Sequence, residues 1–203
     1  MSVSSHFSYK GLLTFQHEEI IVPFNKLINI LKPKRVLEIG TASGGLTLLI
    51  RDLLNQNELQ NTSVISYDVN VPEYLQYHLE EDSIIDVRIK NIFNHPYNDI
   101  IEKDEILKIF DCDGPILVLC DGGSKKNEFN LLSDFLRVGD VIMAHDYAKD
   151  HNFFIENLHG KIWDWHEIQD SDIESCCDKN KLKSFMQDDF TNVVWVCKIK
   201  ENE

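Results

Sequence analysis

Long apolar runs are missing from this sequence of 203 residues. A membrane-spanning helix needs about 20 consecutive apolar residues, whereas the longest apolar runs, such as Ile116–Cys120, have the length of a strand. The first residues, MSVSSHFSYKGLL, also lack the basic region followed by an apolar stretch that marks a secretory signal peptide. The sequence therefore indicates neither a membrane segment nor export, and we expect a cytoplasmic protein.

Basic residues are few relative to acidic ones. The chain has 20 lysines and arginines against 34 aspartates and glutamates, a net charge of −14. Nucleic-acid and anionic-membrane surfaces depend on Lys and Arg to neutralise phosphate. We therefore expect no extended surface of either kind, and a local basic patch stays open. The five cysteines form no CxxC pair and their number is odd, which favours reduced thiols over a disulfide framework or a zinc site.

Low-complexity stretches, internal repeats and linkers are absent as well. A length of 203 residues and a hydrophobic fraction of 43% are typical of one globular domain. We expect a single domain over residues 1–203, with an N-terminal helical segment at 1–33. Residues 170–189 are polar and charged, and their composition suggests a surface insertion.

Strand and helix patterns alternate along the chain. Strands are expected at Arg35–Ile39, 64–68, Ile85–Ile89, Ile116–Cys120, Val141–Ala144, 161–168 and 193–199. Helices are expected at 20–31, 46–54, 72–79, 100–109, 129–135 and 153–158. This alternation predicts an α/β fold with a doubly wound, mostly parallel, Rossmann-like sheet and helices on both faces. Seven strands are expected, the last of them antiparallel.

A glycine-rich loop follows the first expected strand, with the sequence Glu38-Ile39-Gly40-Thr41-Ala42-Ser43-Gly44-Gly45. The dinucleotide fingerprint GxGxxG would need a glycine in place of Ala42, and no Lys-Ser/Thr pair follows Gly45 as in a phosphate-binding Walker loop. The motif that is present, ExGxxxGG, resembles motif I of the class I S-adenosylmethionine-dependent methyltransferases. The alternative is a glycine turn that serves only the fold.

The resemblance implies S-adenosylmethionine as the cofactor. Glu38 and the loop would hold its amino-acid moiety, and Asp68, at the end of the second strand, would accept hydrogen bonds from the ribose hydroxyls. Asn91 and Ile92, together with Phe93, would flank the adenine. The cofactor-binding residues implied in this way are Glu38, Gly40, Thr41, Ser43, Gly44, Gly45, Asp68, Asn91, Ile92 and Asp121.

A second group of polar residues follows the fourth and fifth expected strands. Asp121 begins the stretch Asp-Gly-Gly-Ser-Lys, and the fifth strand ends in His145-Asp146-Tyr147. The ends of neighbouring strands lie about 5 Å apart, so Asp121, His145 and Asp146 are expected to converge. Two carboxylates and an imidazole suit either a divalent cation or a base with its orienting partner.

The spacing of this second group, D-G-G-x-K-x-x-E-F-x-x-L and then G-D-x-I-x-A-H-D-Y, is similar to that of the macrocin O-methyltransferase and cephalosporin-hydroxylase-like branch. With motif I, the resemblance covers residues 14–147. It implies a divalent ion, Mg²⁺ or another, on Asp121, His145 and Asp146, which would hold the hydroxyls of the acceptor. Two positions depart from the pattern, because Ser124 replaces a frequent histidine and His145 replaces one acid of a pair. Metal binding therefore stays open.

The resemblance implies methyl transfer to the oxygen of a small-molecule or sugar hydroxyl. The catalytic candidates are His145, Lys125 and Asp121, with His145 or Lys125 as the base. One alternative is a protein that binds S-adenosylmethionine but has lost the chemistry; another is an enzyme that uses a nucleotide or NAD. We expect a small-molecule acceptor as partner, with no extended nucleic acid and no membrane, and a homo-oligomer stays open.

Four further side chains are expected to have structural roles. Gln16 and His17 precede the first helix and are expected at a solvated helix start; the resemblance implies the alternative that this N-terminal segment caps the cofactor and lines the site. Trp163 and Trp165 alternate along the expected strand 161–168, so they would share one face and lie in the core, and a shelf for the substrate is the alternative.

Overall fold

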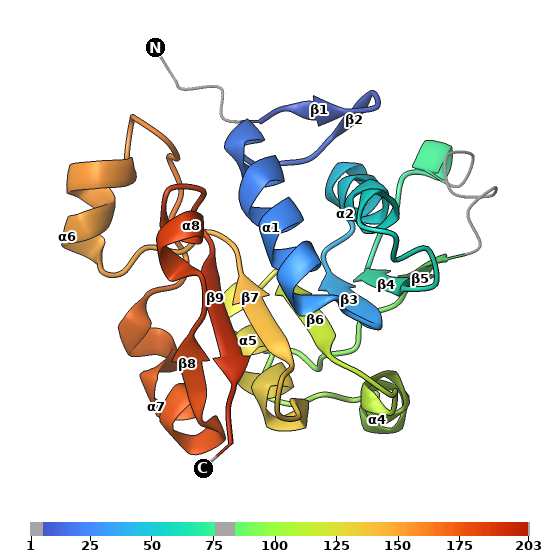
Figure 1. Cartoon of the computed structure of the whole chain (residues 1–203). Coiled ribbons are helices and arrows are strands. Elements are labelled where there is room, and N and C mark those ends of the chain that lie inside the picture. The colour runs from blue at the N-terminus through green and yellow to red at the C-terminus, as the bar shows by residue number, and fades with distance from the viewer. Residues whose placement is uncertain (1–5, 76–83, 203) are drawn as a thin grey trace.

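A seven-stranded sheet forms the centre of the computed structural model, which describes residues 6–75 and 84–202 (Figure 1). Its strand order is β5-β4-β3-β6-β7-β9-β8. Neighbouring strands from β5 to β7 are parallel, whereas β9 runs antiparallel to both β7 and β8. The strands are β3 (Arg35–Ile39), β4 (Ser63–Asp68), β5 (Ile85–Ile89), β6 (Ile116–Cys120), β7 (Val141–Ala144), β8 (Leu182–Ser184) and β9 (Val196–Lys200). The predicted doubly wound sheet with a last antiparallel strand is confirmed.

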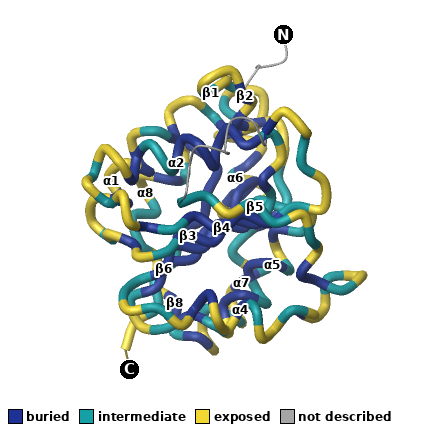
Figure 2. Tube along the Cα trace, turned by 90° about the vertical axis from the view of Figure 1, so that its right-hand side faces the viewer, coloured by how far each residue is buried: buried dark blue, intermediate teal, exposed yellow. Residues whose placement is uncertain are grey.

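Helices cover both faces of this sheet. One apolar cluster joins the sheet to α1 (Ile21–Leu31), α2 (Gly45–Gln56) and α8 (Gln187–Thr191), and the other joins it to α4 (Lys103–Phe110), α5 (Lys125–Leu132) and α7 (Asp170–Asn180). Figure 2 shows β3 and β4 as buried strands between these layers, whereas β5, at the edge of the sheet, is intermediate or exposed. All five residues of β6 are buried, as a strand covered on both faces requires.

Short elements complete the fold. A hairpin of β1 (Ser8–Tyr9) and β2 (Leu12–Leu13) precedes the 3-10 turn η1 (Glu18–Ile20), and a second such turn, η2 (Ser133–Phe135), follows α5. The short α6 (His151–Phe153) continues as a π-helical turn, η3 (Phe154–Leu158). None of the helices in the described part of the chain has the length and apolar character needed to cross a membrane.

The expected strand at 161–168 is wrong. Only Ile168 of this segment forms a bridge, to Tyr147, and the seventh strand is instead β8, within the segment 170–189. The backbone N–H groups of Glu167 and Ile168 both donate to the Asp146 carbonyl, so the segment folds across the end of the sheet. Trp163 is buried but Trp165 is 62% exposed, so the two rings do not share a face.

The other expected elements lie close to their predicted positions. The helix expected at 100–109 begins only at Lys103, because Ile100 bridges to Phe93. Residues 73–75 are helical, as expected for a helix beginning near Pro72, whereas the rest of that helix, including Leu79, lies outside the described residues. The segment 170–189, suggested as a surface insertion, supplies α7, the edge strand β8 and the start of α8.

The strand order reverses between β3 and β6. From β3 the chain proceeds outward to β4 and β5, and β6 then begins the other half of the sheet on the opposite side of β3. In open α/β sheets, ligands bind outside the carboxyl ends of the strands at such a reversal. The loops after β3 and β6 carry the two glycine-rich motifs, so both motifs meet at this edge.

Candidate active site

Gly40 brings the two glycine loops together. Its φ of +96° lies in the region that favours glycine, and a Cβ atom there would lie 2.2 Å from the backbone oxygen of Asp121. The Gly40 N–H donates to the carbonyl of Tyr67 at 2.8 Å, which ties the loop to the end of β4 as well. A side chain at position 40 would push the loops after β3 and β6 apart.

A cavity of about 280 Å³, here called cavity A, opens beside this contact. Asp68 lies on its wall and accepts a hydrogen bond from the Ala42 backbone N–H at 2.8 Å and one from the Asn70 N–H at 3.1 Å. The remaining lining residues come from the ends of β3 to β6, the loops that follow them and the first part of α5. They are Ile39, Gly40, Ala42, Tyr67, Val69, Lys90, Asn91, Ile92, Phe93, Tyr97, Asp121, Gly122, Gly123 and Glu128.

Glu38 is buried directly before the first glycine loop. Its Oε2 accepts hydrogen bonds from the hydroxyls of Thr47 and Ser66, while its Oε1 has no hydrogen-bond partner among the described residues. Burial raises the pKa of Glu38 to about 7, although the two hydroxyls act against this shift. A buried carboxylate with one unpaired oxygen can accept a further donor or positive group.

Four residues implied as cofactor ligands line neither cavity of this site: Glu38, Ser43, Gly44 and Gly45. Ser43 is half-buried, a Cβ on Gly44 would meet the Leu75 side chain, and one on Gly45 would lie 2.4 Å from the Leu13 carbonyl oxygen. Gly44 and Gly45 thus let the loop and the start of α2 pack against neighbouring segments. Thr41 borders the second cavity, and its hydroxyl lies 2.6 Å from that of Ser66.

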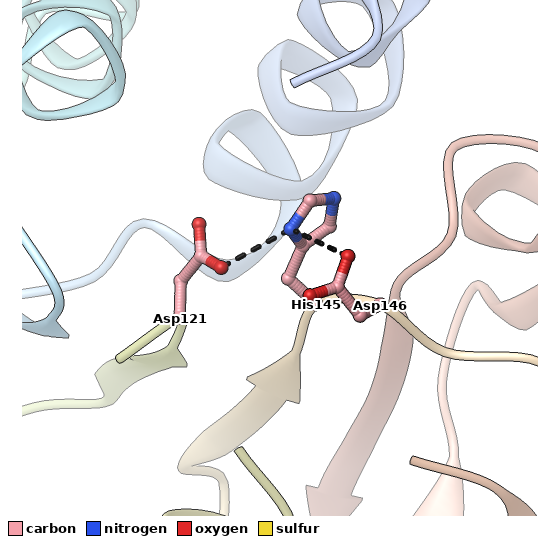
Figure 3. Close-up of side chains that lie close together, drawn as sticks. All are labelled: Asp121, His145 and Asp146. Atoms are coloured by element: carbon pink, nitrogen blue, oxygen red, sulfur yellow. Dashed lines mark hydrogen bonds and ion pairs between the residues drawn. The ribbon is translucent and has the colours of Figure 1, made fainter. Parts of the chain in front are cut away.

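Asp121, His145 and Asp146 converge as expected (Figure 3). The Nδ1 atom of His145 lies 3.1 Å from Asp121 Oδ1 and 3.5 Å from Asp146 Oδ1. One ligand atom from each of the three residues lies within 4.8 Å of the other two. Asp146 has a φ of +57°, and this left-handed turn after β7 aims its carboxylate back towards the histidine.

His145 is enclosed by aromatic rings. The centroids of Trp163 and Trp195 lie 4.9 and 5.0 Å from that of the imidazole, and the buried Nε2 has no hydrogen-bond partner in the described part of the chain. Burial acts to lower the pKa of His145, but the carboxylates of Asp121 and Asp146 outweigh it, so the pKa is raised above 6.5. The ring therefore has one nitrogen held by acids and one that is free.

Lys125, at the start of α5, extends its ammonium group into the same cluster. Nζ lies 3.1 Å from Asp146 Oδ2 and 3.7 Å from Asp121 Oδ1, and it donates to the Gly122 carbonyl at 3.0 Å. Burial acts to lower the pKa of Lys125, but the surrounding carboxylates raise it above its ordinary value. The ammonium therefore keeps its proton, which disfavours Lys125 as a base.

Gln16 belongs to the site, which is the alternative that sequence reasoning ranked below a solvated helix start. Instead of a solvated helix start, the residue is fully buried; its Nε2 donates to Asp121 Oδ2 at 2.7 Å, and its Oε1 accepts from the Trp195 indole at 2.8 Å. These partners lie 105 and 179 residues away in the sequence, so no local pattern could have identified the contact.

Glu128 is a residue that sequence reasoning did not single out. The side chain is buried and accepts backbone hydrogen bonds from Gly122 at 3.0 Å and Ser124 at 2.9 Å. Burial raises the pKa of Glu128 to about 7, against the opposing effect of these hydrogen bonds. The residue holds the second glycine loop in place, and the glutamate at that position of the D-G-G-x-K-x-x-E pattern was the available signal.

A second cavity of about 390 Å³, here called cavity B, lies next to cavity A. The two share Gly40, Ala42 and Asp121 in their walls. The other residues around cavity B are His6, Thr14, Phe15, Thr41, Leu46, Lys125, His145, Asp146, Trp163 and Trp165. A molecule in cavity A can therefore meet one in cavity B beside the Asp121–His145 pair.

Comparison with known proteins gives a family match. The sequence matches the family described as rhamnosyl O-methyltransferase/CmcI over residues 1–165. No curated protein matches the sequence significantly.

Several solved structures share the fold. CmcI with S-adenosylhomocysteine aligns at a TM-score of 0.61 and 12% identity, over 97% of this chain and 83% of that one. CmcI with magnesium and S-adenosylmethionine aligns at 0.58 and 14%, over 95% and 76%. A methyltransferase structure from Thermobifida fusca, assigned in its description only by similarity, aligns at 0.54 and 11%, over 91% and 80%.

Proposed function

The chain belongs to the rhamnosyl O-methyltransferase/CmcI family, and from this membership we propose that it transfers the methyl group of S-adenosylmethionine to a hydroxyl of a small molecule or sugar. The observation that carries the proposal is the junction of cavities A and B at Gly40 and Asp121, next to His145 in the wall of cavity B. Methyl transfer requires two small molecules to meet end to end at one such point.

Cavity A suits the cofactor. Asp68 retains acceptor capacity for the ribose hydroxyls, because a carboxylate has about four lone-pair sites and two are used by backbone N–H groups. Asn91, Ile92 and Phe93 offer an amide and apolar surface for the adenine. Glu38 lines neither cavity, so we assign it to the support of the loop that holds the amino-acid end, through the hydrogen bonds it accepts from Thr47 and Ser66. The solved structures of CmcI with S-adenosylhomocysteine and with S-adenosylmethionine support this choice of cofactor.

Cavity B suits the acceptor, and His145 suits the base. If Nδ1 carries the proton that Asp121 accepts, Nε2 is left with a lone pair for the acceptor's hydroxyl proton. The hydroxyl oxygen then attacks the methyl carbon, the carbon–sulfur bond breaks with its electron pair on sulfur, and S-adenosylhomocysteine and an imidazolium are formed. Asp121 orients the ring and stabilises the imidazolium, as the acid does in other acid–histidine pairs. Asp121 is the positioning residue of this pair, and the charged Lys125 is not the base.

A divalent ion, kept open by the sequence, has three candidate ligands in Asp121, His145 and Asp146. All four carboxylate oxygens of the two aspartates already lie near donors or cations of the protein: Gln16, Lys125, His145 and Trp163. Lys125 Nζ, at 3.1 Å from Asp146 Oδ2 and 3.7 Å from Asp121 Oδ1, would repel a cation held between the two carboxylates. The donor set therefore does not fit an added ion while the ammonium stays in place, and the proposed reaction includes no step through one.

The cofactor assignment is tested by calorimetry with S-adenosylhomocysteine. The variant Asp68→Ala should bind about 1–3 kcal/mol more weakly than the wild type, since it loses a charged hydrogen-bond acceptor. The matched control is Asp104→Ala, because Asp104 is an exposed aspartate on α4 away from both cavities. Equal affinity in all three proteins would reject the site.

The chemistry is tested by incubating the wild type with S-adenosylmethionine and a panel of sugar and small-molecule hydroxyls. Methylated product that depends on His145, with loss of turnover but retained cofactor binding in His145→Gln, is the expected result. Cofactor binding with no transfer to any acceptor in the panel would instead indicate the alternative of a binding protein without transfer activity.

A further inference from the structure

We propose that the ammonium group of Lys125 is the resident cation between Asp121 and Asp146, so that the site works without a divalent metal ion. The position of the ammonium is a property of the protein alone. The effect of the ammonium on catalysis rests on the proposed methyl transfer.

The first argument is the position of the ammonium. Nζ lies 3.1 Å from Asp146 Oδ2, 3.7 Å from Asp121 Oδ1 and 3.4 Å from Glu167 Oε2, with the Gly122 carbonyl oxygen at 3.0 Å. Four oxygens from four separate residues thus surround one nitrogen that carries three protons. The residue is only 9% exposed, so little water competes for these contacts.

The second argument is that Lys125 is held in place from its backbone as well as its side chain. The Lys125 N–H, at the start of α5, donates to Glu167 Oε1 at 2.9 Å. Glu167 in turn donates its own N–H to the Asp146 carbonyl. Withdrawal of the ammonium would therefore disturb α5, the segment after residue 160 and the end of β7 together.

The third argument combines the existing contacts of the carboxylate oxygens with the positive charge of the ammonium. Asp121 Oδ2 accepts from Gln16 and Asp121 Oδ1 contacts the imidazole, while Asp146 Oδ1 accepts from the Trp163 indole at 2.7 Å and Asp146 Oδ2 faces Lys125. Mg²⁺ requires near-octahedral oxygen ligands at about 2.1 Å. An ion close enough to bind both carboxylates would also lie within a few ångströms of the ammonium and be repelled by it.

The role of this cation follows from the charge balance. Without Lys125, the Asp121, Asp146 and Glu167 carboxylates would place three negative charges where the acceptor oxygen develops its own. The ammonium offsets part of this charge, and it leaves Asp121 free to orient His145. A lysine thus supplies, within the chain, the positive charge that a metal ion would otherwise bring.

The test is a titration of the EDTA-treated protein with Mn²⁺, followed by the electron paramagnetic resonance signal of the free ion. Mn²⁺ accepts carboxylate ligands as Mg²⁺ does. The wild type should show no saturable binding below about 1 mM. The variant Lys125→Met keeps much of the apolar stem and removes the charge, so it should bind Mn²⁺ at least roughly tenfold more tightly. The control is Lys126→Met, since Lys126 pairs with Asp172 on the exposed side of α5 and should behave as the wild type.

Two results of the titration would overturn the proposal: saturable wild-type binding that Asp146→Asn abolishes, or a folded Lys125→Met that gains no affinity. If Lys125→Met does not fold, the proposal is decided by whether the wild type binds Mn²⁺ saturably. Methyl transfer should proceed at the same rate in EDTA as in Mg²⁺, and loss in EDTA with recovery on adding Mg²⁺ would also overturn it. Binding of S-adenosylhomocysteine is measured separately, so a failure of the proposed function is distinguishable from a failure of this inference.

Discussion

At the scale of the residue, the two ring nitrogens of His145 have different surroundings. Nδ1 faces two carboxylates, whereas the unpaired Nε2 is flanked by tryptophan rings at the edge of cavity B. The carboxylates favour the charged imidazole more than burial opposes it. As the proposed base, His145 would be active only in its neutral form, so methyl transfer should depend on pH.

The rate of methyl transfer should rise with pH through a midpoint above 6.5, because the pKa of His145 is raised and the neutral ring is the active form. Asp121→Asn removes the nearer carboxylate, so the remaining activity should show its midpoint at lower pH. The measurement is kcat/KM against pH for both proteins. A midpoint that does not move, or that moves upward, would exclude Asp121 as the partner of the base.

At the scale of the element, sequence reasoning located the contiguous apolar strands β6 and β7 and also the strands β3 and β5, in which polar residues interrupt the apolar ones. Strands β3, β5, β6 and β7 begin and end at the predicted residues, and the convergence of Asp121, His145 and Asp146 followed from the order of strand ends. The prediction of a strand at 161–168 was wrong because the aromatic residues of this segment alternate as they would in a strand. The Trp163 indole binds Asp146 instead, and two backbone amides donate to the same residue, so tertiary hydrogen bonds outweigh the local pattern.

The loop between β3 and α2 gives a prediction at this scale. Gly40→Ala should weaken S-adenosylhomocysteine binding at least roughly tenfold, because the added Cβ would meet the Asp121 backbone and separate the two glycine loops. Gly139→Ala is a matched control, since Gly139 also has a positive φ but its Cβ would meet open space. Both variants should lose about 1–2 kcal/mol of stability from backbone strain. Equal cofactor affinity in the two variants would show that the contact between the loops is not needed.

For the whole molecule, the dependence of stability on pH follows from two buried glutamates. Burial raises the pKa of Glu38 and of Glu128 from 4.5 to about 7. The folded protein therefore binds protons that the unfolded chain releases between about pH 4.5 and 7. The contribution of these residues to stability is fully present below the lower value, is lost as the pH rises to about 7, and is constant above it.

The variant Glu38→Gln cannot lose a proton, and its amide oxygen can still accept from Thr47 and Ser66. Relative to the wild type, its free energy of unfolding should improve by about 3 kcal/mol between pH 4.5 and pH 8, since 2.5 pKa units correspond to that amount. Urea unfolding of the ligand-free proteins at both pH values measures the difference. A difference between variant and wild type that stays constant with pH would show that Glu38 ionises normally.

The amide of Gln16 connects three distant parts of the polypeptide: its own N-terminal segment, the end of β6 through Asp121, and the last residue before β9 through Trp195. During synthesis, Asp121 and His145 leave the ribosome well before Trp195 does. Until β9 has paired with β7, the aspartate lacks the support of the Gln16–Trp195 contact, and the histidine lacks one of its two tryptophan neighbours. A nascent chain should therefore consume no cofactor before its final strand has docked.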